Sequence, residues 1–144
     1  DVWDHDSFET AVSVAASLGL ASLRESRPVS VTTTEAWLPS GSAMRLLDTL
    51  SEIKAGSGGD LALRVREAVA ERPGISALTL VVGPKVSDVD AAHLARLAPI
   101  DVPVSIIRIG GAEGRTRRDL GRGVLLDCSR LEDLPRIIVA GGLA

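Results

Sequence analysis

Two almost uninterrupted apolar runs, residues 75–82 and 102–109, constrain the fold more than any other feature of this chain. Such runs are typical of parallel strands that are buried on both faces of a sheet. Between them, Ser87 and Asp90 have the spacing of a capping box, which predicts a helix through Ala98. The order strand, helix, strand therefore predicts an α/β domain of three layers, with a mostly parallel, Rossmann-like sheet and helices on both faces.

The rest of the chain is expected to continue this alternation. Apolar periodicity and capping residues predict helices at residues 7–24, from Ser40 or Ser42 onward, from Asp60 onward and at 134–140. Strands are expected at 29–34 and 124–126, and residues 36–39 are expected to form a short edge strand or a turn. Ser129 and Glu132 have the spacing of a second capping box. Segment 110–123, with five Gly and four Arg, is expected to be the most mobile loop.

Length and charge bound the class of protein. With 144 residues the chain fits a single domain, and its formal net charge of -3 argues against nucleic-acid binding. Cys128 is the only cysteine, so no intrachain disulfide can form and a cytoplasmic location is expected. The uncharged run at 10–23 is shorter than the roughly 20 apolar residues that span a bilayer, so this segment is expected not to cross a membrane. An acidic start without Met indicates that residues 1–144 are a fragment of a longer protein.

The expected carboxyl ends of the strands are the first place to look for a site, because open α/β sheets bind ligands there. These ends fall at residues 32–35, 82–85, 108–111 and 127–129. None of them offers a histidine or a carboxylate pair, so the sequence predicts no catalytic residue, no metal ligand and no cofactor. We expect a binding module and not an enzyme. Its partner-binding rim is placed at Thr34, Glu35, Asp60 and Lys85.

The glycine-rich segment before Asp60 is a second candidate site. The backbone N–H groups of Ser57, Gly58 and Gly59 would favour an anion at the start of the following helix. No Gly-Lys-Ser/Thr follows and a helix, not a strand, precedes, which excludes the phosphate-binding loop and the Rossmann fingerprint. A turn between two helices is the favoured interpretation. Cys128 is likewise interpreted as a small buried residue.

Several segments, read in order, resemble one protein family. They are residues 8–18 (Phe-Glu-Thr-Ala-Val-Ser-Val-Ala-Ala-Ser-Leu), 28–33 (Pro-Val-Ser-Val-Thr-Thr), 38–39 (Leu-Pro), 45–50 (Arg-Leu-Leu-Asp-Thr-Leu) and 58–62 (Gly-Gly-Asp-Leu-Ala). Over roughly residues 7–109 the chain resembles the C-terminal part of the domain-of-unknown-function family 58. Members of that family carry a von Willebrand A-like domain, are commonly encoded beside MoxR-type AAA+ ATPases, and often have membrane helices upstream.

The resemblance implies an N-terminally truncated von Willebrand A-like domain that works with a MoxR-type AAA+ ATPase in a membrane-anchored protein. It also implies a Mg²⁺ site, but the Asp-x-Ser-x-Ser motif is absent. The loop Thr and the strand-end Asp of that site fall on Gly59 and at or near Pro84, which have no side-chain oxygen. The metal site is therefore expected to be degenerate.

The family's first strand is also missing from this chain. Strands 29–34 and 75–82 are therefore expected to pair directly, or the gap between them to be filled by the terminus or by a neighbouring chain. The latter would make a homo-oligomer through the incomplete sheet. A small-molecule or nucleotide-binding enzyme and a purely structural domain remain as alternative functions.

Overall fold

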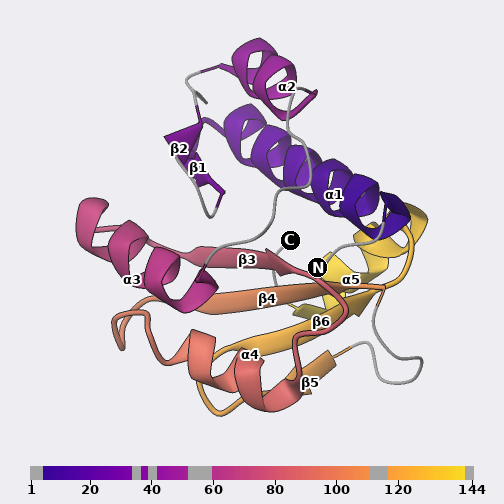
Figure 1. Cartoon of the computed structure of the whole chain (residues 1–144). Coiled ribbons are helices and arrows are strands. Elements are labelled where there is room, and N and C mark those ends of the chain that lie inside the picture. Colours follow the sequence, from indigo (N-terminus) through magenta and orange to yellow (C-terminus); the bar gives the residue numbers. More distant parts are fainter. Residues whose placement is uncertain (1–4, 34–36, 39–41, 52–59, 111–116, 142–144) are drawn as a thin grey trace.

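The computed structural model describes residues 5–33, 37–38, 42–51, 60–110 and 117–141 (Figure 1). Its helices are α1 (His5–Arg24), α2 (Ala43–Ser51), α3 (Leu61–Glu71), α4 (Asp88–Ala95), the 3-10 turn η1 (Leu131–Asp133) and α5 (Leu134–Gly141). Its strands are β1 (Val31–Thr32), β2 (Trp37–Leu38), β3 (Leu78–Val82), β4 (Val104–Ile109), β5 (Arg117–Asp119) and β6 (Val124–Cys128). The molecule is therefore mixed α/β, as predicted. No helix in the described ranges has the length and apolar character needed to cross a membrane.

The larger sheet has four strands in the order β3-β4-β6-β5. β3, β4 and β6 are parallel, and β5 runs antiparallel to β6 at one margin. The two apolar runs recognised in the sequence form β3 and β4, and every residue of β4 is buried. The prediction of a mostly parallel sheet is confirmed.

The core consists of two clusters that share the strands of this sheet. The first joins Val104 and Ile106 of β4 to residues of α3 and α4, such as Val65 and Ala91. The second joins Ile107 and Ile109 to Ala11 and Val14 of α1 and to Leu134 and Ile137 of α5. Because neighbouring residues of a strand point to opposite faces, the alternation along β4 separates the two clusters.

Local capping signals account for most helix starts. Ser87 and Asp90 form the predicted capping box at the start of α4, and Asp60 accepts a hydrogen bond from the Leu63 N–H as the N-cap of α3. Ser42 Oγ accepts a hydrogen bond from the Arg45 N–H at the start of α2. The second predicted capping box is wrong, because the chain enters η1 through Arg130 without any side-chain cap bond.

The predicted strand at residues 29–34 does not join the main sheet. Its described part, β1, pairs antiparallel with β2 in a separate two-stranded sheet, with Val31 opposite Leu38 and Thr32 opposite Trp37. The prediction that it pairs directly with the strand at residues 75–82 is therefore wrong. The other expectation, that the terminus or a neighbouring chain fills the gap, remains a prediction.

The hairpin β1–β2 is attached to α3, which explains its position. The buried guanidinium of Arg64 donates to Thr32 Oγ1 from Nη2 at 2.6 Å and from Nε at 2.9 Å. The guanidinium carbon of Arg72 lies 4.0 Å from the centroid of the Trp37 ring, and Trp37 Nε1 donates to Glu71 Oε1 at 2.9 Å. Side-chain hydrogen bonds and a cation–π contact therefore fix the hairpin to the helix.

The segment expected to be a mobile loop contains a strand. Arg117–Asp119 forms β5 and pairs with β6, with Arg118 opposite Leu125. The loop interpretation is wrong for residues 117–119, where Arg118 binds Asp127 of β6 and Asp88 of α4, as described next. Residues 111–116 of the same segment lie outside the described ranges.

Candidate functional site

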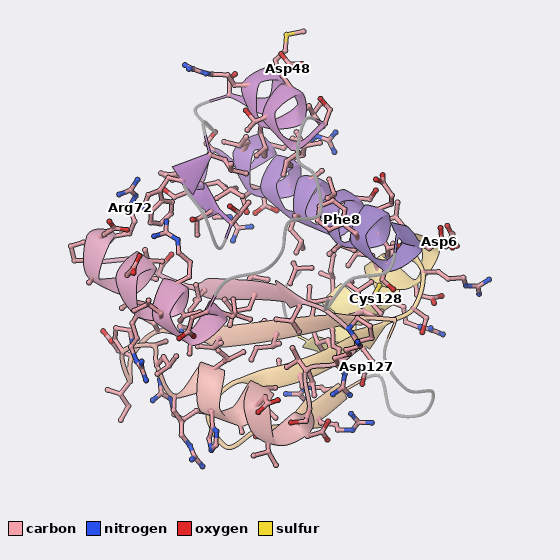
Figure 2. The ribbon with its side chains drawn as sticks, in the orientation of Figure 1. Asp6, Phe8, Asp48, Arg72, Asp127 and Cys128 are labelled. Carbon is pink, nitrogen blue, oxygen red and sulfur yellow. The ribbon has the colours of Figure 1, made fainter. Side chains whose placement is uncertain are left out.

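Four charged side chains gather at the carboxyl edge of the parallel strands. Arg108 and Asp127 lie near the ends of β4 and β6, Asp88 is the first residue of α4, and Arg118 belongs to β5. Figure 2 shows Asp127 at this edge, with the nitrogen atoms of basic side chains beside it. We call these four residues the carboxyl-edge cluster.

The centre of the cluster is a buried, bidentate ion pair between Arg108 and Asp127. Arg108 and Asp127 are opposite each other in the β4–β6 ladder. Arg108 Nε donates to Asp127 Oδ1 at 2.7 Å, and Arg108 Nη2 donates to Asp127 Oδ2 at 3.1 Å. Only 6% of Arg108 and 8% of Asp127 is exposed. Two parallel bonds between a guanidinium and a carboxylate give both strength and a fixed geometry.

Asp88 and Arg118 complete the cluster toward solvent. Arg108 Nη1 donates to Asp88 Oδ1 and to the Val86 carbonyl, each at 2.9 Å. Arg118 Nη1 donates to Asp88 Oδ1 at 3.2 Å and to Asp127 Oδ2 at 3.1 Å. The side chains of Asp88 and Arg118 are 52% and 24% exposed. The cluster therefore ties three strands to the start of α4 and ends at the surface.

The cluster is electrically balanced, with two cations and two anions. The hydrogen bonds to Asp127 raise the pKa of Arg108 above its ordinary value, burial opposes this effect, and Asp88 adds to it. Arg108 is therefore charged throughout the physiological pH range. Asp88 also lies in the first turn of α4, where the helix dipole favours a negative charge.

The start of α1 reaches the same edge of the sheet. Gly110 has a φ of +67° directly after β4, and a Cβ at this position would lie 2.8 Å from Ser7 Oγ and 3.9 Å from Pro84 Cβ. Only glycine accommodates both the left-handed backbone and this close approach. The first turn of α1, the turn after β3 and the end of β4 therefore meet at one place.

The rim residues predicted from the sequence are only partly placed. Lys85 is exposed in the turn between β3 and α4, close in sequence to Asp88. Asp60 is exposed at the start of α3, where its carboxylate is engaged in capping. Thr34 and Glu35, and the anion-binding candidates Ser57, Gly58 and Gly59, lie outside the described residues.

Cys128 is fully buried, in agreement with its interpretation from the sequence. Burial raises the pKa of its thiol, and the charge of nearby Asp133 raises it further. Its Sγ donates a hydrogen bond to the Arg130 carbonyl at 3.1 Å. A protonated, inaccessible thiol is unsuited to nucleophilic chemistry.

The carboxyl-edge cluster does not suit a divalent cation. Asp88 and Asp127 each accept hydrogen bonds from both Arg108 and Arg118, so a metal at either carboxylate would lie beside two guanidinium groups. Within the described ranges, no three or more His, Cys, Asp or Glu residues are grouped so that they could hold a metal ion.

Sequence reasoning missed this cluster, although Arg108 and Asp127 stand at strand ends that it had singled out. Only histidines and carboxylate pairs were considered as candidate site residues at these strand ends. Arg108 and Asp127 are a single arginine and a single aspartate, 19 residues apart, and met neither criterion. Opposite charges inside two otherwise apolar strand runs were the available signal, since a buried charge requires a partner. Comparison with models of known protein families, with curated proteins and with solved structures gave no match.

Proposed function

We propose that this domain is a non-enzymatic protein-interaction module that binds its partner at the carboxyl edge of the sheet. The observation that supports this proposal most directly is the exposure of an apolar side chain at this edge. Val89 lies in the first turn of α4, between Asp88 and Asp90, and is 64% exposed. Val89 stands between two carboxylates, and protein-binding surfaces combine an apolar centre with a polar rim. The carboxyl-edge cluster fixes the position of this surface, because Arg108 of β4 binds Asp88 and the Val86 carbonyl at the start of α4.

The chemistry of the edge supports binding in preference to catalysis. The charged groups of the cluster are already paired with one another, and the one cysteine is buried and protonated. Because these charges are compensated within the cluster, we propose that the edge binds a partner and does not act as a catalyst. Partner capture through a Mg²⁺ ion, as the family resemblance would imply, does not fit the residues of this edge, so we propose metal-independent binding.

The resemblance to the domain-of-unknown-function family 58 suggests the kind of partner. On that basis we propose a three-layer von Willebrand A-like arrangement, with α1 and α5 against one face of the sheet and α3 and α4 against the other. The division of the core into two clusters supports this arrangement. We further propose that the partner is a MoxR-type AAA+ ATPase and that the domain is the cytoplasmic part of a membrane-anchored protein.

The test is a binding measurement between this domain and purified MoxR-type ATPase from the same cell, with and without ATP and in the presence of EDTA. The test variant is Val89→Asp, in which a charge replaces the apolar centre of the proposed surface. The matched control is Ile100→Asp, because Ile100 is 88% exposed and precedes β4 at the other end of the sheet. We expect Val89→Asp to weaken binding at least about tenfold and Ile100→Asp to leave it unchanged.

Other outcomes would contradict the proposal. If both variants bind the ATPase equally well, the carboxyl edge is not the binding surface. If the ATPase does not bind, the proposed partner is wrong, and thermal stabilisation of the domain by a nucleotide would then favour the small-molecule alternative. Absence of both effects would favour a structural domain.

A further inference from the structure

The turn that precedes β4 carries an apolar residue at its tip. Ile100 and Asp101 are the two central residues of this turn, which the Val102 N–H closes by donating to the Pro99 carbonyl at 3.0 Å. Ile100 is 88% exposed, more than any other large apolar side chain in the described part of the chain. Turn tips usually carry Gly, Pro, Asn, Asp or Ser, so turn chemistry alone does not explain an isoleucine at this position.

Arg122 holds this turn in place. It lies between β5 and β6, and its Nη2 donates to the Ala98 carbonyl at 3.1 Å and to the Pro99 carbonyl at 2.9 Å. The turn before β4 is thereby joined to the turn before β6. A side chain displayed on a fixed turn loses little backbone freedom when it is bound, which favours association.

Two hollows lie beside Ile100 at this end of the sheet, which we call the amino edge because β4 and β6 begin there. Figure 1 shows it opposite to the carboxyl edge. The larger hollow, of about 380 Å³, exceeds the volume of an isoleucine side chain. Its lining includes Ile100, Asp101, Val102, Val104, Arg122 and Val124. The smaller hollow, of about 240 Å³, shares Asp101 and Val102 with it. The amino edge therefore presents a protruding apolar side chain and a hollow that could receive one.

The amino edge also carries two opposite charges that are not paired with each other. Asp101 is exposed and Arg122 is half-buried, and both line the larger hollow. Among the described residues neither forms an ion pair, since Arg122 binds only the two carbonyls and no described group binds the Asp101 carboxylate. In a two-fold symmetric interface, a contact between two different residues occurs twice. Asp101 of one copy can thus face Arg122 of the other at two equivalent places.

We propose that the amino edge is a homodimer interface, in which two copies of this chain meet about a two-fold axis. Ile100 of each copy enters the larger hollow of the other, and Asp101 of each copy pairs with Arg122 of the other. The occupant is a second copy because this one surface supplies the apolar side chain, the hollow and both members of the ion pair. Val89 lies at the opposite edge and stays accessible in the dimer, so the inference does not depend on the function proposed for that surface.

The first test is sedimentation equilibrium of the 144-residue chain at concentrations up to about 1 mM. We expect the wild type to dimerise and Ile100→Asp to weaken the dimer at least about tenfold, because a charge replaces the apolar side chain that enters the hollow. The matched control is Val89→Asp, which places the same charge on an exposed valine at the other edge and should leave the dissociation constant unchanged. Thermal unfolding confirms that each variant is folded.

A second test exchanges the charges and depends on the two-fold pairing itself. Asp101→Arg brings two arginines together at each contact, and Arg122→Asp brings two aspartates together. Each variant alone should therefore dimerise at least about tenfold more weakly than the wild type. In an equimolar mixture, a heterodimer of the two variants has opposite charges at both contacts. We expect this heterodimer to form at least about tenfold more tightly than either variant dimerises alone.

Three results would overturn the proposal. One is a wild type that remains monomeric at about 1 mM. Another is a dimer that Ile100→Asp and Val89→Asp affect equally, which would place the interface elsewhere. The third is a mixture of Asp101→Arg and Arg122→Asp that associates no more tightly than the separate variants, because the two charges would then not meet across the interface.

Discussion

Replacing Arg108 by Met should destabilise the domain by about 3 kcal/mol, because it leaves Asp127 charged and buried. Asp127 is 8% exposed and loses two of its three side-chain hydrogen bonds from arginine, those at 2.7 and 3.1 Å. Only the bond from Arg118 Nη1 remains. Removing one partner of a buried ion pair typically costs about 3–5 kcal/mol, and the remaining Arg118 bond places the expected loss at the lower end.

The assay is urea and thermal unfolding of the wild type, Arg108→Met, Asp127→Leu and the double variant. A loss of about 3 kcal/mol lowers the midpoint temperature by roughly 10 °C in a domain of this size. The double variant removes both charges and should lie within about 1 kcal/mol of the wild type, because apolar replacement of a buried pair is often neutral. Arg130→Met is the control, since Arg130 is 73% exposed and its nearest carboxylate oxygen lies at 3.9 Å. Such a surface pair contributes about 0–1 kcal/mol.

The pH dependence of this effect has a definite sign. The folded-state pKa of Arg108 is raised, so its contribution is fully present below the unfolded pKa of arginine and is lost only in strong alkali. The difference between the wild type and Arg108→Met should therefore be constant around neutral pH. A single-variant loss below about 1 kcal/mol would refute the reasoning, and so would a double variant whose loss equals the sum of the single losses.

The remaining predictions concern three other positions. Burial raises the pKa of Cys128 in the folded state, so as pH rises the thiol of the unfolded state loses its proton first. The free energy of unfolding should therefore fall as pH rises above about 8.5, by up to about 1.4 kcal/mol per pH unit. The slope should disappear in Cys128→Ala, and unfolding curves at several alkaline pH values check this. Gly123→Ala should lower the free energy of unfolding more than Gly121→Ala does. Both glycines have a φ near +80°, but only at Gly123 would an added Cβ approach the Val104 carbonyl oxygen, at 2.6 Å. Gly121→Ala should cost about 1 kcal/mol from backbone strain alone, and equal losses in denaturant unfolding would show that the close approach is unimportant. Asp60→Ala should cost about 1 kcal/mol by removing the N-cap of α3, and Asp60→Asn should retain most of the stability; an equal loss in both would mean that charge, not capping, is at work.

Features encoded by neighbouring residues could be predicted from the sequence. The capping box at Ser87, the N-cap at Asp60 and the apolar strands β3 and β4 all appear where the local pattern places them. These signals depend on spacing over a few residues, which sequence displays directly. The mixed α/β class and the mostly parallel sheet follow from them.

Strand neighbours could not be predicted in the same way. Arg108 and Asp127 become a pair only because β6 lies beside β4, and Arg118 reaches them only because β5 pairs with β6. The strand at residues 29–34 was expected in the sheet, yet Arg64 holds its described part against α3. In each case an arginine side chain binds a group distant in sequence.

The sequence by itself determined most of the helices of this chain and its two apolar strands, β3 and β4, but it did not reveal β5. Tertiary structure alone decided which charges meet at the carboxyl edge and which strands form the two margins of the sheet in the described part of the chain. The physical reason is the range of the forces involved. Helix caps and apolar periodicity act over a few residues, whereas a buried charge finds its partner only after strand order has been set by packing of the whole sheet.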